Sequence, residues 1–376
     1  MAQIEFSDEQ AMLSETAADF CARHSPIDKV RSLINTDDGR DADVWRGITK
    51  LGWVGIAVPE QYGGLGLGLA SVVPVLESMG RHLLASPYFA TNLAAHALVT
   101  SADESQKQTW LPKIVEGAVA TIGLTEADGN WRLEELVSEG RVNGDRITLT
   151  GGKRFVLDAA LADVFIVSVR IDGAPRLVLI ERSQLRAGAC RRETVIDETR
   201  RSFALDLDGV VVPRANLLPH ADLAALEQAA LLLLCAEISG GIAGVLHVIV
   251  AYLNTRKQFG RLIGSYQSLK HPTVEILLAA EAAKSFLYHA ATMLAKGDAR
   301  GFDIAVRSAK AHGSAAFANA GDRAVQFHGG FGFTYECDAQ LFLRRALWCQ
   351  YQFGDERHQR ALLAPLLFDD LDRRRS

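Results

Sequence analysis

A chain of 376 residues is long enough to form two or three domains or layers. Its hydrophobic fraction of 48% and charged fraction of 23% are typical of a globular enzyme. The net charge of −5 provides no broad basic surface, so we expect no nucleic-acid partner and interpret the Arg373–Arg375 run as a solvated tail.

The cysteines are five in number and form no Cys-x-x-Cys pair. The sequence therefore indicates neither a disulfide framework nor a zinc site, and we expect no bound metal. The first residues lack the basic and then apolar order of a signal peptide. These features favour a cytoplasmic protein.

The first part of the chain, residues 1–118, is predicted to be helical. Ser7 followed by Glu9 predicts a helix start, and Leu13 and Ala17 recur at helical spacing. A glycine cluster follows at Gly63, Gly64, Gly66 and Gly68. Its spacing differs from the Gly-x-Gly-x-x-Gly of nucleotide loops, and no strand precedes it, so an irregular turn between helices is expected.

Residues 119–219 have the pattern of strands and tight turns. Asn143–Asp145 is a hairpin signal. Val164–Val169 and Leu177–Ile180 are strand-like and are separated by Asp172–Gly173. We expect a small antiparallel β domain here.

Long apolar helical periodicity returns in residues 220–376 and predicts a helical bundle. The apolar region Leu231–Leu253 is long enough to cross a bilayer. It contains Glu237 and His247 as well as several glycines, which favours a buried bundle helix over a membrane span. The predicted fold class is a multidomain α+β protein, with an N-terminal helical domain, a central β domain and a C-terminal bundle.

Two stretches in the last third of the chain have the residues expected of a ligand site. The first is Arg256–Gly260, continuing to Gln267, and the second is Gln326–Phe333. Arginine offers a fixed fork of donors that suits phosphate. Paired glycines end a helix and let a ligand approach the backbone closely. The alternatives are a charged helix end with a core phenylalanine, and a helix stop with a Schellman-type turn.

These two stretches resemble the flavin-binding signatures of the acyl-CoA dehydrogenase family. Three earlier segments also resemble family motifs and occur in the family's order: Leu51–Gly66, Leu124–Glu126 and Gly152–Val156. The resemblance covers nearly the whole chain and implies an FAD cofactor, an acyl-CoA substrate and an electron-transfer flavoprotein as electron acceptor.

The resemblance also implies which residues hold the flavin. Residues matching Arg256, Phe259 and Gln267 contact the FAD of a neighbouring subunit. Thr125 would hydrogen-bond the flavin and Phe155 would stack on it, whereas a turn hydroxyl and a core aromatic are the alternatives. The full implied set is Thr125, Phe155, Arg256, Gln258, Phe259, Gln267, Gln326, Gly329, Gly330, Gly332 and Asp355, although Asp355 is also interpreted as a helix cap.

The catalytic base expected from the family is missing. Relatives remove an α-proton with a glutamate while the flavin accepts a hydride from the β-carbon. Phe353 and Ala230 occupy the two places where relatives have that glutamate. Glu237 is two helical turns beyond Ala230, about 10 Å away, and is the candidate catalytic residue. A carboxylate that braces the bundle is the alternative.

The usual acyl-CoA anchor is absent as well, since Gln228 and Leu231 replace its Asp and Arg. The segment Asp197–Arg201 resembles an actinobacterial subgroup that includes steroid-CoA dehydrogenase subunits, some of which form α2β2 assemblies with the base on one subunit type. We expect oxidation of an acyl-CoA to the 2,3-enoyl-CoA by a homodimer or homotetramer. A non-catalytic half-site subunit, in a heterotetramer with a glutamate-bearing paralogue, is the alternative. A nitroalkane oxidase would need an aspartate where Phe353 lies.

Overall fold

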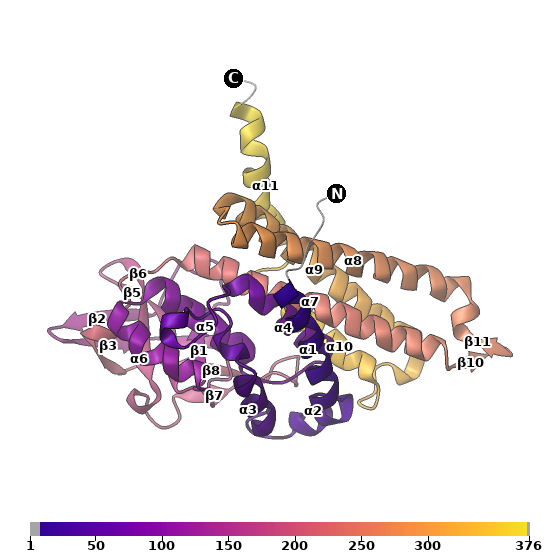
Figure 1. Cartoon of the computed structure of the whole chain (residues 1–376), viewed down its shortest axis with the longest axis horizontal. Helices are drawn as coiled ribbons and strands as arrows, with labels where there is room; N and C mark the ends of the chain where they lie inside the picture. Colours follow the sequence, from indigo (N-terminus) through magenta and orange to yellow (C-terminus); the bar gives the residue numbers. More distant parts are fainter. Residues whose placement is uncertain (1–7, 374–376) are drawn as a thin grey trace. The chain divides into compact units, whose positions relative to one another are not determined.

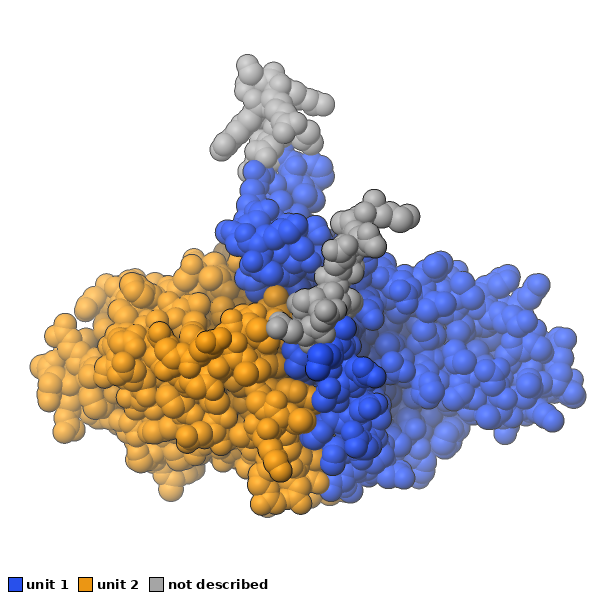
Figure 2. Space-filling view, in the orientation of Figure 1, with its two compact units in different colours: residues 1–32, 73–84, 231–376 blue, residues 33–72, 85–230 orange. Residues whose placement is uncertain are grey.

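The computed structural model describes the backbone of residues 8–373 and the side chains of residues 11–368. The predicted helix start at Ser7 and the side chains of Arg373–Arg375 lie outside these ranges. The chain divides into two compact units, shown in Figures 1 and 2. Unit 1 contains residues 1–32, 73–84 and 231–376, and unit 2 contains residues 33–72 and 85–230. The expected division at 118 and 219 stays a prediction.

The helices of unit 2 begin where side chains satisfy free backbone amides. Asp41 accepts the amide of Asp43 at 2.8 Å and starts α3. Asp103 and Gln106 form a reciprocal capping box at the start of α6. The helices are α3 (Ala42–Lys50), α5 (Tyr88–Ser101) and α6 (Glu104–Val115), and α2 (Ile27–Ile34) crosses the unit boundary. The glycine cluster lies in turns between short 3-10 helices, as predicted.

The strands of unit 2 form two sheets. The larger has the order β1-β5-β2-β3-β9, with β6 beside β5, and the smaller has the order β4-β8-β7. The strands are β1 (Ala120–Gly123), β2 (Glu139–Asn143), β3 (Arg146–Thr150), β4 (Gly152–Leu157), β5 (Val164–Ile171), β6 (Ala174–Glu181), β7 (Cys190–Arg192), β8 (Ser202–Asp206) and β9 (Val211–Pro213).

Both predicted hairpins are present. Asp172 and Gly173 have φ of 51° and 77°, as a two-residue I′ turn requires. Gly144, the first central residue of the other turn, has φ of 63°. The pairing is antiparallel except that β1 and β2 each run parallel to β5, which corrects a purely antiparallel reading.

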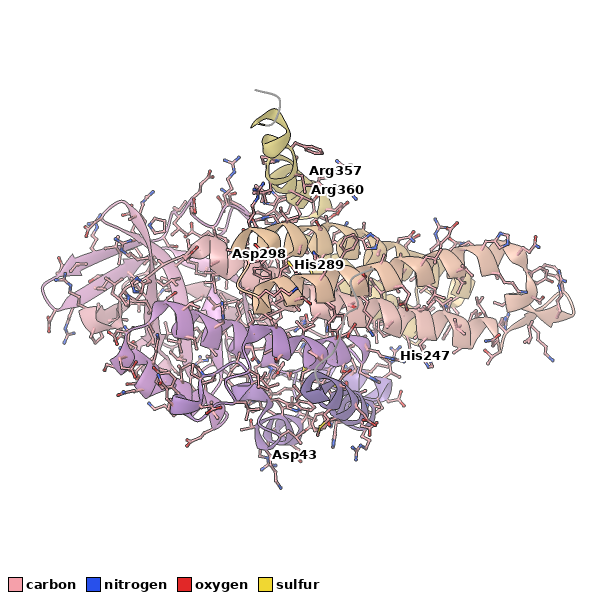
Figure 3. The ribbon with its side chains drawn as sticks, turned by 45° about the horizontal axis from the view of Figure 1, so that its top comes forward. Asp43, His247, His289, Asp298, Arg357 and Arg360 are labelled. Carbon is pink, nitrogen blue, oxygen red and sulfur yellow. The ribbon has the colours of Figure 1, made fainter. Side chains whose placement is uncertain are left out.

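Unit 1 is built from helices. They are α1 (Asp8–His24), α4 (Val73–Arg81), α7 (Leu223–Leu253), α8 (Gln267–Ala295), α9 (Ala299–His328), α10 (Asp338–Tyr351) and α11 (Glu356–Arg373), with a short hairpin of β10 (Lys257–Gln258) and β11 (Arg261–Leu262). The boundary between the units falls within α7. Asp298, labelled in Figure 3, caps α9 by accepting the amide of Gly301 at 2.8 Å.

Helix α7 alone, among the described residues, is long and apolar enough to cross a membrane by length and composition. However, 89% of its most apolar window is buried inside the protein, which is typical of a core helix. Its glycines permit close packing: a Cβ on Gly240 would lie 1.8 Å from the carbonyl oxygen of Glu77 on α4.

Candidate functional site

The fold of unit 2 brings Thr125 and Phe155 together. The amide of Arg154 donates to the carbonyl of Thr125 at 2.9 Å. The pairing of β4 with β8 shifts register between Lys153 and Val156, and this irregularity turns Phe155 outward. Phe155 keeps 39% of its surface exposed and has φ of 54°. The alternative of an ordinary core phenylalanine therefore does not hold.

A buried ion pair fixes these two segments. Lys153 donates to the Glu126 carboxylate at 2.7 Å and to the Ser168 hydroxyl at 3.2 Å. Glu126 also accepts the amides of Val137 and Ser138. Burial alone would raise the pKa of Glu126, but the Lys153 ammonium and these amides together hold that pKa below its ordinary value. Glu126 is thus an ionised anchor beside Thr125.

A second carboxylate supports the backbone at Phe155. Glu193 accepts the Phe155 amide at 3.0 Å, the Ser202 hydroxyl at 2.8 Å and the Arg154 guanidinium at 3.1 Å. A recess of about 410 Å³ opens next to Phe155. Arg191 and two further arginines line it together with Glu193.

The segment around Arg256 in unit 1 is a strained hairpin. Phe259 and Gly260 form its tip, with φ of 51° and 80°. Phe259 is 91% exposed and meets the Tyr266 ring edge-on at 6.4 Å. Arg256, Gln258 and Gln267 are exposed too. The alternative of a core phenylalanine therefore fails here as well.

The second motif ends helix α9. Gly329 has φ of 62° and ψ of −142°, a region open essentially to glycine alone, and a 3-10 turn follows it. The end therefore differs from the Schellman-type turn that is the alternative for this motif. A Cβ on Gly332 would lie 2.2 Å from the Val325 carbonyl oxygen, whereas Gly330 borders open space. Gln326 is exposed.

A ring stack holds the two motifs of unit 1 side by side. The rings of Tyr252 and His328 lie 4.0 Å apart, and the Tyr252 hydroxyl reaches the His328 carbonyl at 3.5 Å. Tyr252 is at the end of α7, just before Arg256, and His328 is the last residue of α9. Arg256 and the glycine turn therefore begin from adjacent helix ends.

Asp355 acts as a helix cap in this structure. Its carboxylate accepts the amides of Arg357 and His358 at 3.1 and 2.8 Å, and so begins α11. This agrees with one of the two roles expected for Asp355, and its contact with a flavin stays a prediction. The neighbouring Phe353 is the third phenylalanine with a left-handed backbone, at φ of 55°.

The three left-handed phenylalanines are a shared feature of the candidate segments. Phe155 and Phe259 each lie in a flavin-type motif and Phe353 occupies the place of the family's base, and bulky residues rarely adopt this conformation. Strained residues of this kind concentrate at functional sites, where surrounding structure holds them. Leu83, at φ of 49°, is also left-handed but lies outside the motifs, so the strain supports the motifs at Phe155 and Phe259 without being confined to them.

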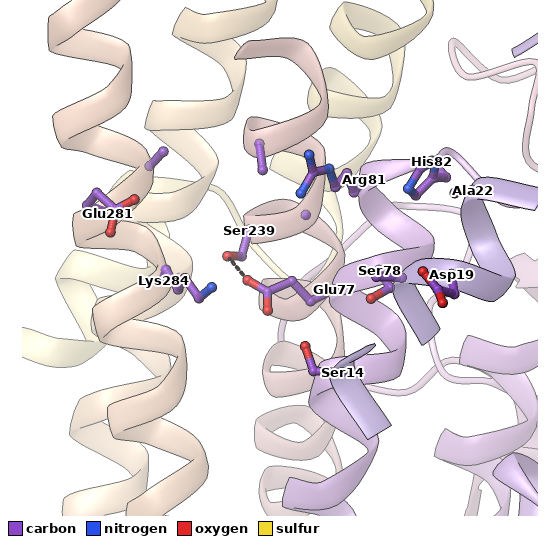
Figure 4. A pocket seen from close by; sticks show the side chains of 14 residues that line it. Ser14, Asp19, Ala22, Glu77, Ser78, Arg81, His82, Ser239, Glu281 and Lys284 are labelled. Carbon is purple, nitrogen blue, oxygen red and sulfur yellow. Dashed lines mark hydrogen bonds between the residues drawn. The ribbon is translucent and has the colours of Figure 1, made fainter. Parts of the chain in front are cut away.

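Glu237 is buried, with 4% of its surface exposed, on the same helix as Ala230. The sequence did not point to a second acid nearby, Glu77 on α4. It accepts the hydroxyls of Ser239 at 2.7 Å and Tyr288 at 2.6 Å. Figure 4 shows Glu77 at a cavity of about 540 Å³ together with charged residues such as Lys284. Burial, reinforced by Glu77, raises the pKa of Tyr288.

Comparison with known proteins identifies the family. Residues 7–118 match the acyl-CoA dehydrogenase N-terminal domain, and residues 223–367 match the C-terminal domain. The chain therefore belongs to the acyl-CoA dehydrogenase family of flavoprotein oxidoreductases. It is 28% identical over 354 residues to "Acyl-CoA dehydrogenase IpdE2" of Mycolicibacterium smegmatis, covering 94% of this chain and 97% of the relative.

Solved structures agree with this assignment. A variant of the "Tcur3481-Tcur3483 steroid ACAD" is 25% identical and has a TM-score of 0.88. The match covers 97% of this chain and 99% of that chain. The "ChsE4-ChsE5 complex" from Mycobacterium tuberculosis has a TM-score of 0.89 at 24% identity. The match covers 97% of this chain and 98% of that chain, and at this identity it shows the fold alone. The predicted fold class and the resemblance to the actinobacterial subgroup are confirmed.

Proposed function

We propose that this chain binds FAD noncovalently and takes part in the oxidation of an acyl-CoA thioester to its 2,3-enoyl-CoA, in the cytoplasm, with electrons passed to an electron-transfer flavoprotein. The carrying observation is that two strained phenylalanines of the described fold, Phe155 and Phe259, lie within the flavin-type motifs, and that a third, Phe353, occupies the place of the family's base. Bound FAD supplies the hydride acceptor for this chemistry.

The residues present fit such a cofactor. Gly329 and Gly330 have open space where a side chain would lie, so a pyrophosphate can approach their backbone. Phe155 offers an exposed aromatic surface suited to stacking, and the adjoining Arg154 amide binds the carbonyl of Thr125. Arg256 is an exposed guanidinium suited to a phosphate oxygen.

The assignment is tested on flavin content. Arg256→Ala removes one or two charge-assisted hydrogen bonds, each worth about 1.5–3 kcal/mol, so FAD retained after dialysis should fall. Lys257→Ala is the control, because Lys257 is exposed, adjoins Arg256 and is not one of the implied flavin-binding residues; this variant should retain FAD as the unaltered protein does. Equal retention in both variants would remove this role from Arg256.

A second candidate function is a half-site subunit that completes a partner's flavin site without turning over. Phe353 and Ala230 favour it, because neither can accept a proton. The name of the ChsE4-ChsE5 complex, a chain of which has this fold, describes an assembly of two different proteins. Under this reading, acyl-CoA should not bleach the flavin of the isolated chain, whereas adding a glutamate-bearing paralogue should restore bleaching. Bleaching of the isolated chain would rule this reading out.

A further inference from the structure

The turn at residues 351–355, between α10 and α11, has an unusual backbone. Phe353 and Gly354 are left-handed, at φ of 55° and 93°. Glycine reaches this region freely, but phenylalanine does so only when its surroundings hold it there. The turn therefore needs a source of restraint.

Lys310 provides one restraint from the middle of α9. Its side chain is fully buried. Its ammonium donates to the Gln350 carbonyl at 2.9 Å, to the Gly354 carbonyl at 2.8 Å and to the Ser314 hydroxyl at 2.9 Å. These acceptors use all the donors of an ammonium, and the Gln350 carbonyl is one of those left free at the end of a helix.

A second restraint acts on Phe353 itself. Gln359 on α11 is fully buried and donates to the Phe353 carbonyl at 2.6 Å. Its own carbonyl accepts the guanidinium of Arg307 at 3.0 Å, and Arg307 is oriented by Asp303 at 2.7 Å. The carbonyls of Gln350, Phe353 and Gly354 are thus all bound by buried side chains.

The charge of Lys310 is consistent with this role. A buried ammonium is costly unless hydrogen bonds compensate for its lost hydration. Burial lowers its pKa to about 8, while Cys235, Cys349, Glu356 and Asp355 act in the opposite direction. The group therefore stays mainly protonated at neutral pH and keeps its three donors.

We propose that Lys310 is a positioning residue. Together with the Arg307–Gln359 pair, it holds turn 351–355 in the left-handed conformation that fixes the position of the Phe353 side chain. The functional importance of this position rests on the proposed function, since the turn then borders the flavin and acyl-CoA site. The restraint itself does not depend on that function.

The test is hydrogen exchange on the purified full-length protein, followed over the peptide covering residues 350–359. Lys310→Met should speed its exchange tenfold or more. Phe317→Leu is the control, because Phe317 is also buried on α9, where it packs against Gly241 on α7. It should lower thermal stability about as much as Lys310→Met does, but leave the exchange rate of this peptide unchanged. If Lys310→Met does not fold, Ser314→Ala removes one acceptor of Lys310, and Gln359→Leu removes the bonds to the Phe353 carbonyl and to Arg307. Each should speed exchange by a smaller factor.

A double-mutant comparison distinguishes positioning of the turn by Lys310 from a general contribution of Lys310 to stability. In Phe353→Gly the left-handed backbone is unstrained, so Lys310→Met should speed exchange much less there than in the unaltered background. Equal factors in the two backgrounds, or unchanged exchange in Lys310→Met, would overturn the proposal. The visible circular dichroism of bound FAD should also change in Lys310→Met and not in Phe317→Leu. A protein that holds no FAD would contradict the proposed function, while the exchange result would still decide the role of Lys310.

Discussion

At the scale of single residues, the left-handed phenylalanines connect conformation with ligand binding. Phe259 is the clearest case, because it is 91% exposed and substitution there loses little packing. A left-handed backbone costs a residue with a Cβ roughly 1–2 kcal/mol relative to its usual conformation. An exposed residue that keeps this cost is expected to serve a contact that the isolated chain does not contain.

Replacing Phe259 by glycine should therefore raise stability and lower flavin retention together. We expect a gain of about 1 kcal/mol from the relieved backbone, measured as a higher melting temperature of the flavin-free protein. Phe259→Ala is the matched control: it also loses the ring, and so the flavin, but retains the strain. Higher flavin retention in the glycine variant would show that the ring has no part in binding.

Glu237 stays the candidate catalytic base for a chain that works alone. If the chain removes the α-proton itself, Glu237→Gln should leave FAD bound and slow flavin bleaching by acyl-CoA about 10²-fold or more. The isosteric amide keeps the volume of this buried site, so stability should change little. Turnover that survives the substitution would exclude Glu237 and turn attention to Asp355.

At the scale of elements, the Glu126–Lys153 pair links three parts of the β domain. Glu126 holds the amides that precede β2, and Lys153 on β4 also reaches Ser168 on β5. Removing one partner leaves the other charge buried without compensation, which typically costs about 3–5 kcal/mol. This pair places Thr125 next to the bulge at Phe155.

The Glu126–Lys153 pair should make the stability of the protein depend on pH. Since the folded-state pKa of Glu126 is lowered, its contribution is present above the unfolded value of about 4.3 and is lost as pH falls through the folded value. Melting temperatures measured from pH 6 to pH 3 should fall more steeply in the unaltered protein than in Glu126→Gln. Glu139→Gln breaks an exposed pair with Arg170 and should keep the steep dependence. Parallel curves for Glu126→Gln and the unaltered protein would contradict this.

Local chemistry was the part of the fold that could be predicted. Asp172–Gly173 specified its turn without reference to distant residues, and the glycines after His328 specified a helix end. The parallel pairing of Ala120 with Val164 depends on chain segments 44 residues apart, which no local pattern encodes. Lys310 was missed for the same reason, because its acceptors are carbonyls 40 and 44 residues away.

The missing base shows the limit of motif reading at the site. The sequence identified Phe353 as a departure from the family, but its left-handed backbone and buried supports are visible only in three dimensions. A buried lysine in an otherwise small and apolar helix segment, Ala309–Ala311, was the one available signal. It did not indicate which backbone groups the ammonium would bind.

At the scale of the whole molecule, α11 leaves apolar surface without cover in the described residues. Leu362, Leu367 and Phe368 are 37%, 44% and 59% exposed. With exposed Phe259, this surface favours a protein that works as a dimer or larger assembly.

Charges placed on this helix should weaken assembly and leave the protomer folded. Leu367→Glu with Phe368→Glu is expected to lower the native mass at micromolar concentration, because carboxylates resist burial between subunits. Arg360→Glu, an exposed change on the same helix, is the control for added negative charge. A flavin-loaded monomer of the unaltered protein in native mass spectrometry would refute the need for assembly.

The hairpin that carries Phe259 has a consequence for the affinity with which the protein would bind FAD. Contacts made by one subunit to a neighbour's cofactor exist only while the two are associated, so cofactor affinity and assembly are linked by mass action. Dilution at a fixed concentration of free FAD should therefore lower the fraction of protein that carries the cofactor. Concentrating the protein should restore that fraction without any added reagent.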